Sequence, residues 1–160
     1  MCALNVVKGM ILFMNKFKLF IDVLIPVVIS GIVGFIINPY IDYNSLVQLP
    51  LSPPSIAFPI VWTILYILMG VSYYLLKNPD RKEKMIYFVQ LGVNALWSVF
   101  FFVFKFYLFS FVWILLLDVL VILMIIIFCR NNKVSAYLQI PYLVWILFAS
   151  YLNLGIYILN

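Results

Sequence analysis

Histidine is absent from the chain, and charged residues of both signs are rare. The 160 residues include 10 Lys+Arg and 5 Asp+Glu, so charged residues make up 9% of the sequence, whereas soluble domains contain about 25%. The absence of histidine excludes His-based catalytic triads and most zinc or haem-iron sites. So few charges cannot cover the surface of a protein that folds in water. The main solvent of this chain is therefore the lipid bilayer.

Cysteine is almost as scarce, because the chain has only Cys2 and Cys129. These two thiols form no metal-ligand spacing motif, so we expect no metal site and no obligatory cofactor. The few basic residues follow no pattern that favours nucleic acid. We expect membrane lipid, and not nucleic acid, as a partner.

Apolar residues make up 68% of the sequence. They form five segments, each long enough to cross a bilayer as a helix of about 20 residues. Prolines, asparagines and charged residues separate the segments. The sequence therefore predicts an all-α integral membrane protein, a five-transmembrane-helix bundle. The predicted spans are about 19–37, 56–76, 85–104, 107–129 and 134–159.

The weakest predicted boundary lies between the third and fourth spans. Residues 100–111 contain no glycine or proline, and Lys105 is their only charged residue. An unbroken helix through both spans would have about 45 residues, which is too long for a single crossing. We therefore predict a tight helical hairpin at Lys105.

Basic residues predict the orientation of the bundle. All of them except Lys105 fall on one side, and loops rich in Lys and Arg stay in the cytoplasm. We expect a multi-pass protein of a bacterial cell membrane, with a cytoplasmic N-terminus and the C-terminus outside. The stretch from Asn38 to Ser55 is then a long outward-facing loop. The basic residues on the cytoplasmic side are Lys8, Lys16, Lys18, Lys77, Arg81, Lys82, Lys84, Arg130 and Lys133.

Two parts of the chain are predicted to differ in organisation. Residues 1–18 form a cytoplasmic N-terminal arm, because Lys8 interrupts the apolar run and no small-residue cleavage site follows it. Residues 19–160 form one five-helix transmembrane domain.

The change of composition at Asn15 raises the hypothesis that translation starts at Met10 or Met14. An N-terminal peptide that begins before Met10, found by mass spectrometry of the native protein, would dismiss this hypothesis.

Asp118 lies in the middle of the fourth predicted span. An ionisable group at this depth is costly and usually faces the protein interior, a cavity or a partner. One interpretation is a ligand anchor or a proton-linked group. The other is an acid that packs helices together by hydrogen bonding. We favour the packing role, since polar groups in membranes often bond across helices.

The second, third and fifth predicted spans carry polar side chains, whose hydrogen bonds lipid cannot satisfy, and aromatic side chains that recur at helical spacing. Such faces form either interhelical contacts or the lining of a pocket, and convergence of several faces favours a cavity. Ser30 and Gly34 in the first span form a small-residue pair, which we interpret as close helix packing. The polar and aromatic faces comprise Trp62, Tyr66, Met69 and Tyr73; Gln90, Asn94, Trp97, Ser98 and Phe101; and Tyr142, Trp145, Ala149, Leu152 and Asn153.

Three sequence blocks carry a family resemblance. They are SPPSIAFPIVWTILYILMG at residues 52–70, the set Gln90-Leu91, Asn94, Trp97-Ser98 and Phe101-Phe102, and PYLxWxxFAxxLN at residues 141–153. In this order and spacing they resemble the second, third and fifth helices of the translocator protein family, also called tryptophan-rich sensory proteins (TspO/MBR) or peripheral-type benzodiazepine receptors. Asp118 matches an acidic position in that family's fourth helix. The resemblance covers about residues 50–153.

The resemblance implies a five-helix membrane protein, often a homodimer, with a pocket for porphyrins such as protoporphyrin IX, for sterols or for synthetic aromatic ligands. Trp62 and Trp145 match tryptophans linked to light-dependent porphyrin breakdown, which makes them the candidate catalytic residues. The segment from Asn38 to Ser55 corresponds to the family's lid. The candidate ligand-binding residues are Phe58, Trp62, Tyr66, Asn94, Trp97, Phe101, Trp145, Phe148 and Ala149.

The chain departs from the family pattern at two places. Leu51 stands where the family commonly has a tryptophan, two residues before the double proline. Tyr157 is followed by Ile158, Leu159 and Asn160 without a basic residue. The cholesterol motif, itself a weak pattern, is thus absent from the C-terminus, which argues against sterol binding.

We therefore expect a membrane receptor or sensor that binds porphyrin-type tetrapyrroles or similar flat ligands between Trp62 and Trp145. Aromatic faces suit a planar ring, and Asn94 or loop N–H groups would meet the propionates. If bound porphyrin is degraded in light, the porphyrin absorbs the light and the protein contributes positioning and oxidisable tryptophans. Enzyme activity stays open. The alternatives are a small transporter of porphyrin or another metabolite, and a membrane assembly factor that binds no ligand.

Overall fold

The computed structural model describes residues 2–41, 49 and 52–160, with side chains from residue 16 onward. Within these residues there is no strand, and five helical segments are long and apolar enough to cross a membrane. They are 16–40, 57–75, 81–103, 107–131 and 133–159. The predicted all-α membrane fold is confirmed, with each span within a few residues of its expected position.

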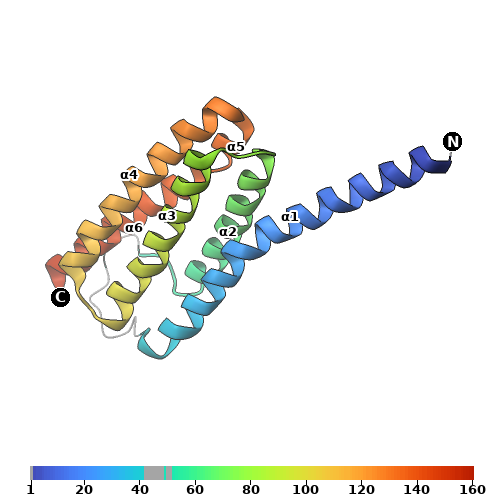
Figure 1. Ribbon diagram of the computed structural model, residues 1–160. Helices are drawn as coiled ribbons and strands as arrows, with labels where there is room; N and C mark the ends of the chain where they lie inside the picture. The colour runs from blue at the N-terminus through green and yellow to red at the C-terminus, as the bar shows by residue number, and fades with distance from the viewer. Residues whose placement is uncertain (1, 42–48, 50–51) are drawn as a thin grey trace.

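Helix α1 (Cys2–Ile37) is the longest element and only part of it belongs to the bundle. Figure 1 shows its N-terminal portion extending well beyond the other helices, while the C-terminus of the chain lies at the opposite end. Pro26 lies inside this helix without ending it. The short 3₁₀ helix η1 (Asn38–Tyr40), with Pro39 in its first turn, terminates α1.

The α1 helix packs chiefly on α2 (Ala57–Leu75). Gly70 of α2 allows this contact, because a Cβ atom there would lie 2.6 Å from the carbonyl oxygen of Asp22 and would overlap the backbone of Val23. Two helix backbones can approach this closely only at a residue without a side chain. Gly70 therefore sets the separation of α1 and α2.

Helix α3 (Arg81–Ser98) begins with a capping box in which Asp80 and Glu83 each accept a 2.7 Å hydrogen bond from the other's backbone N–H. It continues into a five-residue π-helix, η3 (Val99–Val103). Lys105 then adopts a left-handed backbone conformation with φ of 54°, and α4 (Tyr107–Asn131) follows. The tight hairpin predicted at Lys105 is confirmed.

The last span consists of two helices rather than one, α5 (Lys133–Tyr137) and α6 (Ile140–Leu159). The Asn132 side chain caps α5 by accepting hydrogen bonds from the N–H groups of Val134 and Ser135. Pro141 lies in the first turn of α6, where its missing N–H is tolerated. The break between them was not expected from the apolar pattern, which runs through it.

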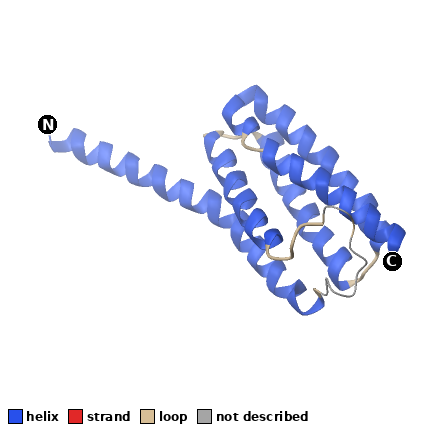
Figure 2. Cartoon of the chain, turned by 180° about the vertical axis from the view of Figure 1, so that it is seen from behind, coloured by secondary structure: helices blue, strands red, loops and turns tan. Residues whose placement is uncertain are grey.

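Helices α2, α3, α4 and α6 enclose the core, and α1 covers one side of it (Figure 2). The centre of α4 is completely buried at Ile114, Leu117 and Val121, whereas its other faces expose large apolar side chains. Such an apolar exterior is the expected surface of a helix bundle in lipid. The described bundle is therefore built to be embedded in a bilayer.

Candidate ligand-binding site

A cavity of about 540 Å³ lies between α1, α2, α6 and the segment formed by α3 and η3. Its volume falls within the range of small-molecule sites, which is about 300–1,000 Å³. The cavity lies toward the end of the bundle that carries η1. The described lining residues are Ser30, Val33, Gly34, Ile37, Asn38, Ile41, Ser55, Phe58, Pro59, Trp62, Thr63, Tyr66, Trp97, Ser98, Phe101, Phe102, Ala149, Leu152, Asn153 and Ile156.

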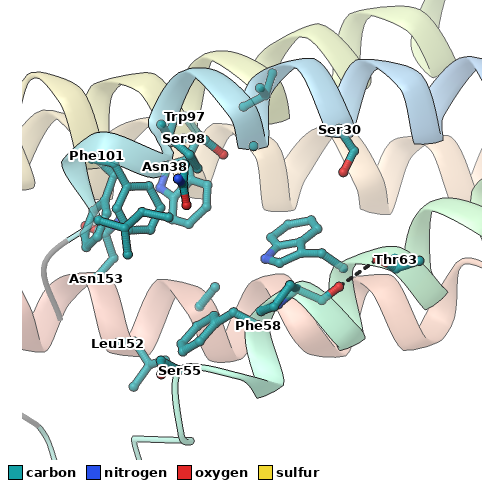
Figure 3. Close-up of a pocket in the computed structure, with 18 of the residues that line it drawn as sticks. Ser30, Asn38, Ser55, Phe58, Thr63, Trp97, Ser98, Phe101, Leu152 and Asn153 are labelled. Carbon is teal, nitrogen blue, oxygen red and sulfur yellow. Dashed lines mark hydrogen bonds between the residues drawn. The ribbon is translucent and has the colours of Figure 1, made fainter.

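Aromatic rings form a large part of the cavity wall (Figure 3). Trp62 stacks on Tyr66 with ring centroids 5.5 Å apart, and its ring lies 6.3 Å from that of Trp97. Trp97 in turn stacks on Phe101 at 5.6 Å. Rings held against one another in this way present fixed faces to a planar ligand.

The π-helix η3 explains how α3 supplies two neighbouring rings to the cavity. Phe101 and Phe102 are adjacent in sequence and both line it. Consecutive residues of an α-helix point about 100° apart, and the wider π turn occurs mostly as a single-turn bulge inside an α-helix, frequently at a functional site. Phe102 belongs to one of the family-like sequence blocks, but it is not among the predicted ligand-binding residues.

None of the described lining residues is charged. The polar ones are hydroxyl and amide side chains, and Thr63 uses its hydroxyl to donate a 2.8 Å hydrogen bond to the Pro59 carbonyl. The described residues also contain no group of three or more His, Cys, Asp or Glu side chains that could hold a metal ion. The described wall of the cavity is thus aromatic and electrically neutral.

A layer of hydrogen bonds lies behind the cavity wall. The amide of Asn94 donates to the Tyr66 hydroxyl at 3.0 Å, and the Tyr142 hydroxyl donates to Gln90 at 3.1 Å. Gln90 is completely buried and its amide also approaches the sulfur of Met69. For Gln90 and Asn94, interhelical hydrogen bonding therefore accounts for at least part of the polar face seen in the sequence.

The structure divides the predicted site residues into two layers. Asn94, Trp145 and Phe148 are not among the described lining residues. Trp145 packs behind the wall, 5.9 Å from the ring of Phe58 and 5.8 Å from that of Phe148. The predicted residues that do line the cavity are Phe58, Trp62, Tyr66, Trp97, Phe101 and Ala149.

Helix α1 contributes a wall of the cavity, although none of the predicted ligand-binding residues lies in it. Ser30 and Gly34 line the cavity, and a Cβ atom built at Gly34 would meet nothing within 4 Å in the described structure. Within the described chain the predicted close packing is therefore not found at Gly34, and the close approach of α1 to α2 occurs at Gly70. Small size here leaves room for the cavity. Half of the predicted lid at 38–55, namely residues 42–48 and 50–51, lies outside the described residues.

Asp118 is buried between α4 and α6 and is not among the described lining residues. The Ser150 hydroxyl of α6 donates a 2.8 Å hydrogen bond to one of its carboxylate oxygens. This bond joins the two central helices. The arrangement supports the packing role over that of a ligand anchor.

Comparison with known proteins gives consistent matches over the segments that build the cavity. A sequence model of the TspO/MBR family matches residues 23–159. The chain is 43% identical over 113 residues to the tryptophan-rich protein TspO of Archaeoglobus fulgidus, covering 68% of this chain and 73% of that protein. It is 38% identical over 124 residues to the Chlorobaculum tepidum protein of the same name, covering 74% and 78%. It is 30% identical over 150 residues to the translocator protein homolog of Schizosaccharomyces pombe, covering 86% and 88%.

Proposed function

The chain belongs to the TspO/MBR family, and on that premise we propose that it is a membrane receptor or sensor for flat hydrophobic ligands of the porphyrin type. Family membership supports a sensor or transporter-like role in the membrane. The ligand binds in the cavity between α1, α2, α3 and α6. Protoporphyrin IX is the ligand that we propose to test first.

The aromatic wall of the cavity is the observation that carries this proposal. Trp62, Tyr66 and Trp97 come from two helices and form a continuous group of rings beside an open volume of about 540 Å³. A tetrapyrrole is planar and mostly apolar, so it gains from stacking on such rings and from leaving water. The neutral lining matches the apolar body of the ligand.

Titration of detergent-purified protein with protoporphyrin IX tests the proposal. We expect saturable quenching of tryptophan fluorescence at a fixed molar ratio of porphyrin to protein, together with a shift of the porphyrin Soret band. Quenching that does not saturate, or that equals the effect on empty micelles mixed with free tryptophan, would contradict it. Loss of the Soret band in light, faster than for porphyrin in micelles alone, would add a degradation activity.

Reconstitution distinguishes a receptor from the transporter alternative. A receptor retains porphyrin up to its binding stoichiometry in proteoliposomes, whereas a transporter accumulates it beyond that amount. A protein that only assembles another complex binds no porphyrin and co-purifies with a stoichiometric partner. The homodimer that the resemblance implies stays a prediction, which crosslinking in native membranes would test.

The proposal includes an orientation for the bundle. The N-terminal arm and the basic loops face the cytoplasm, and the end that carries η1 and the cavity faces outward. Exposed basic residues lie at the opposite end, in or beside the α2–α3 and α4–α5 connections, and support this arrangement. They are Lys77, Arg81, Lys82, Lys84, Arg130 and Lys133. Ligand would then enter from the outer side of the membrane or from its outer leaflet.

A further inference from the structure

One end of the bundle gathers exposed basic side chains from two separate connections. Hydrogen bonds hold these connections together, because the Asn132 amide donates to the Leu75 carbonyl at 2.9 Å and the hydroxyls of Ser72 and Ser135 each donate to the other's carbonyl. Figure 1 shows α5 at the same end of the bundle as the α2–α3 connection. We call the exposed cations of this end the basic surface; they are Lys77, Arg81, Lys82, Lys84, Arg130 and Lys133.

The acids that belong to the same connections do not neutralise the basic surface. They are Asp80 and Glu83, which accept 2.7 Å hydrogen bonds from backbone N–H groups in the cap of α3. Glu83 is buried and also accepts a hydrogen bond from the Asn131 amide at 3.3 Å. The basic surface therefore keeps a net positive charge.

Part of this positive charge opposes the stability of the fold. Arg81, Lys82 and Lys84 lie in the first turn of α3, where the helix dipole favours negative and disfavours positive side chains. Topology explains why Lys and Arg stay on one side of the membrane, but it does not require that two connections bring them to one surface. An anion bound from outside would offset the repulsion.

Exposed apolar side chains accompany three of these cations. Each follows its cation by four residues, so the two share a helix face. Because α3 and α5 both lead from this end of the bundle into a membrane span, the apolar side chain lies deeper in the bilayer than the cation. A phospholipid has the same order, with a charged phosphate above an apolar chain. The pairs are Arg81 with Met85, Lys84 with Phe88, and Lys133 with Tyr137.

We propose that the basic surface binds the headgroups of anionic phospholipids. Cations of both connections hold the phosphate diester, and the acyl chains lie along the exposed apolar side chains one turn deeper. Guanidinium groups match the geometry of phosphate oxygens, and lysines near the membrane surface are attracted to anionic lipid. A lipid fits better than a soluble anion, because only a lipid contacts both the cations and their apolar neighbours. This inference does not depend on what the cavity binds.

Intact-protein mass spectrometry tests the proposal on detergent-purified protein. The protein is equilibrated with equimolar phosphatidylglycerol and phosphatidylcholine that carry the same acyl chains, and the lipids that it retains are counted. We expect at least fivefold more phosphatidylglycerol than phosphatidylcholine. This preference should fall when ammonium acetate is raised from about 0.1 M to about 1 M, because the Debye length shortens from about 10 Å to about 3 Å.

Removal of charge from both connections should abolish the preference. The triple variant Arg81→Gln, Lys84→Gln and Lys133→Gln keeps long polar side chains, and its ratio of the two lipids should fall below twofold. Lys105→Gln is the matched control, because Lys105 is also exposed but lies in the α3–α4 hairpin at the other end of the bundle. It should leave the ratio unchanged. A melting temperature close to that of the parent confirms that each variant is folded.

Loss of the apolar neighbours should act differently from loss of charge. The double variant Met85→Ser and Tyr137→Ser keeps every cation, so it should retain less of both lipids while the ratio between them stays at least fivefold. Phe88 is left in place, because its ring also packs on Tyr73 and Tyr87.

Three results would overturn the inference. The first is equal retention of the two lipids by the parent protein, and the second is a preference that the triple variant keeps or that Lys105→Gln also loses. The third is displacement of phosphatidylglycerol by a soluble anion at equal concentration. Displacement by glycerophosphoglycerol, the headgroup without acyl chains, would assign the basic surface to a soluble phosphate diester. Displacement by polyglutamate would assign it to an acidic protein segment.

Discussion

Trp62 and Trp145 occupy different layers of the cavity wall. Trp62 lines the cavity and is in contact with Tyr66, Trp97 and Tyr142. Trp145 packs behind Phe58, and its indole nitrogen is buried without a partner. Substitution of a side chain that touches the ligand should change ligand affinity more than substitution of a side chain that only packs behind it. Ligand affinity should therefore distinguish the roles of the two tryptophans.

Replacement of Trp62 by phenylalanine should weaken protoporphyrin IX binding at least fivefold. The smaller ring loses stacking area, and aromatic pairs contribute about 0.5–1.5 kcal/mol beyond the area they bury. Trp145→Phe is the control and should change the dissociation constant less than twofold. Soret absorbance is the readout, because tryptophan quenching itself changes in these variants. Equal effects of the two substitutions would contradict the layered arrangement.

A larger side chain at Gly34 should block the cavity without unfolding the protein. A Cβ atom at this position meets nothing within 4 Å, and the residue lines the cavity. Gly34→Leu should therefore abolish saturable porphyrin binding while the melting temperature changes little. Gly31→Leu is the matched control, because Gly31 also has open space but is not among the described lining residues. Retained binding in Gly34→Leu would place the ligand elsewhere.

At the scale of elements, α1 has few contacts apart from those with α2. Among the spans, the one in α1 has the smallest buried share, yet α1 supplies one wall of the cavity. Its position depends on the contact of Val23 with Gly70. On the opposite side of α2, Ser72 and Ser135 form reciprocal hydrogen bonds that join α2 to α5, each hydroxyl donating to the other's carbonyl at 2.8 and 2.6 Å. Helix α2 is thus fixed by α5 and in turn positions α1.

Replacement of Gly70 by alanine should separate α1 from α2. The added methyl group meets backbone atoms, which cannot move aside as a flexible side chain can. Overpacking of this kind destabilises a protein by about 1–3 kcal/mol, so the melting temperature in detergent should fall and porphyrin affinity should fall with it. Gly92→Ala in α3, where nothing lies within 4 Å of the new atom, should leave both unchanged or raise stability. A Gly70→Ala protein with unchanged melting temperature and porphyrin affinity would refute the close contact between α1 and α2 at this residue.

At the scale of the whole molecule, the exposed basic residues of the described chain lie at the end opposite the cavity, with the exception of Lys105. Three hydrogen bonds connect the helix ends that carry these basic residues. Lys18 donates to the Lys77 carbonyl at 2.5 Å. Asn131 donates to Glu83 at 3.3 Å, and Asn132 donates to the Leu75 carbonyl at 2.9 Å. The nearby acids Asp80 and Glu83 are used in the cap of α3. The basic side chains are left exposed there, which favours the cytoplasmic face of a membrane.

Single cysteines should reveal this orientation in intact cells. With Cys2 and Cys129 replaced by serine, Lys105→Cys should react with a membrane-impermeant maleimide added outside. Lys82→Cys should react only after the membrane is permeabilised. Both lysines are exposed, so accessibility within the protein does not limit either reaction. The reverse pattern would show that the bundle is inverted and that the cavity opens toward the cytoplasm.

The sequence by itself determined the membrane class, the five spans and the hairpin at Lys105. Each depends on local quantities: the length of an apolar run against the thickness of the bilayer, and the charges that bound the run. The family resemblance also came from local strings, and the comparisons confirm it. The break between α5 and α6 escaped prediction because the apolar pattern continues through it.

Only the tertiary structure decided which inward faces line a cavity and which bond to another helix. Asn94 and Trp97 are neighbours on α3, yet Asn94 bonds to Tyr66 while Trp97 lines the cavity. The sequence showed that both face inward, but not how far away the next helix lies. That distance depends on pairs remote in the chain, such as Gly70 with Val23. The cavity between the helices results from how all of them pack together, so it cannot be predicted from the sequence of any single helix.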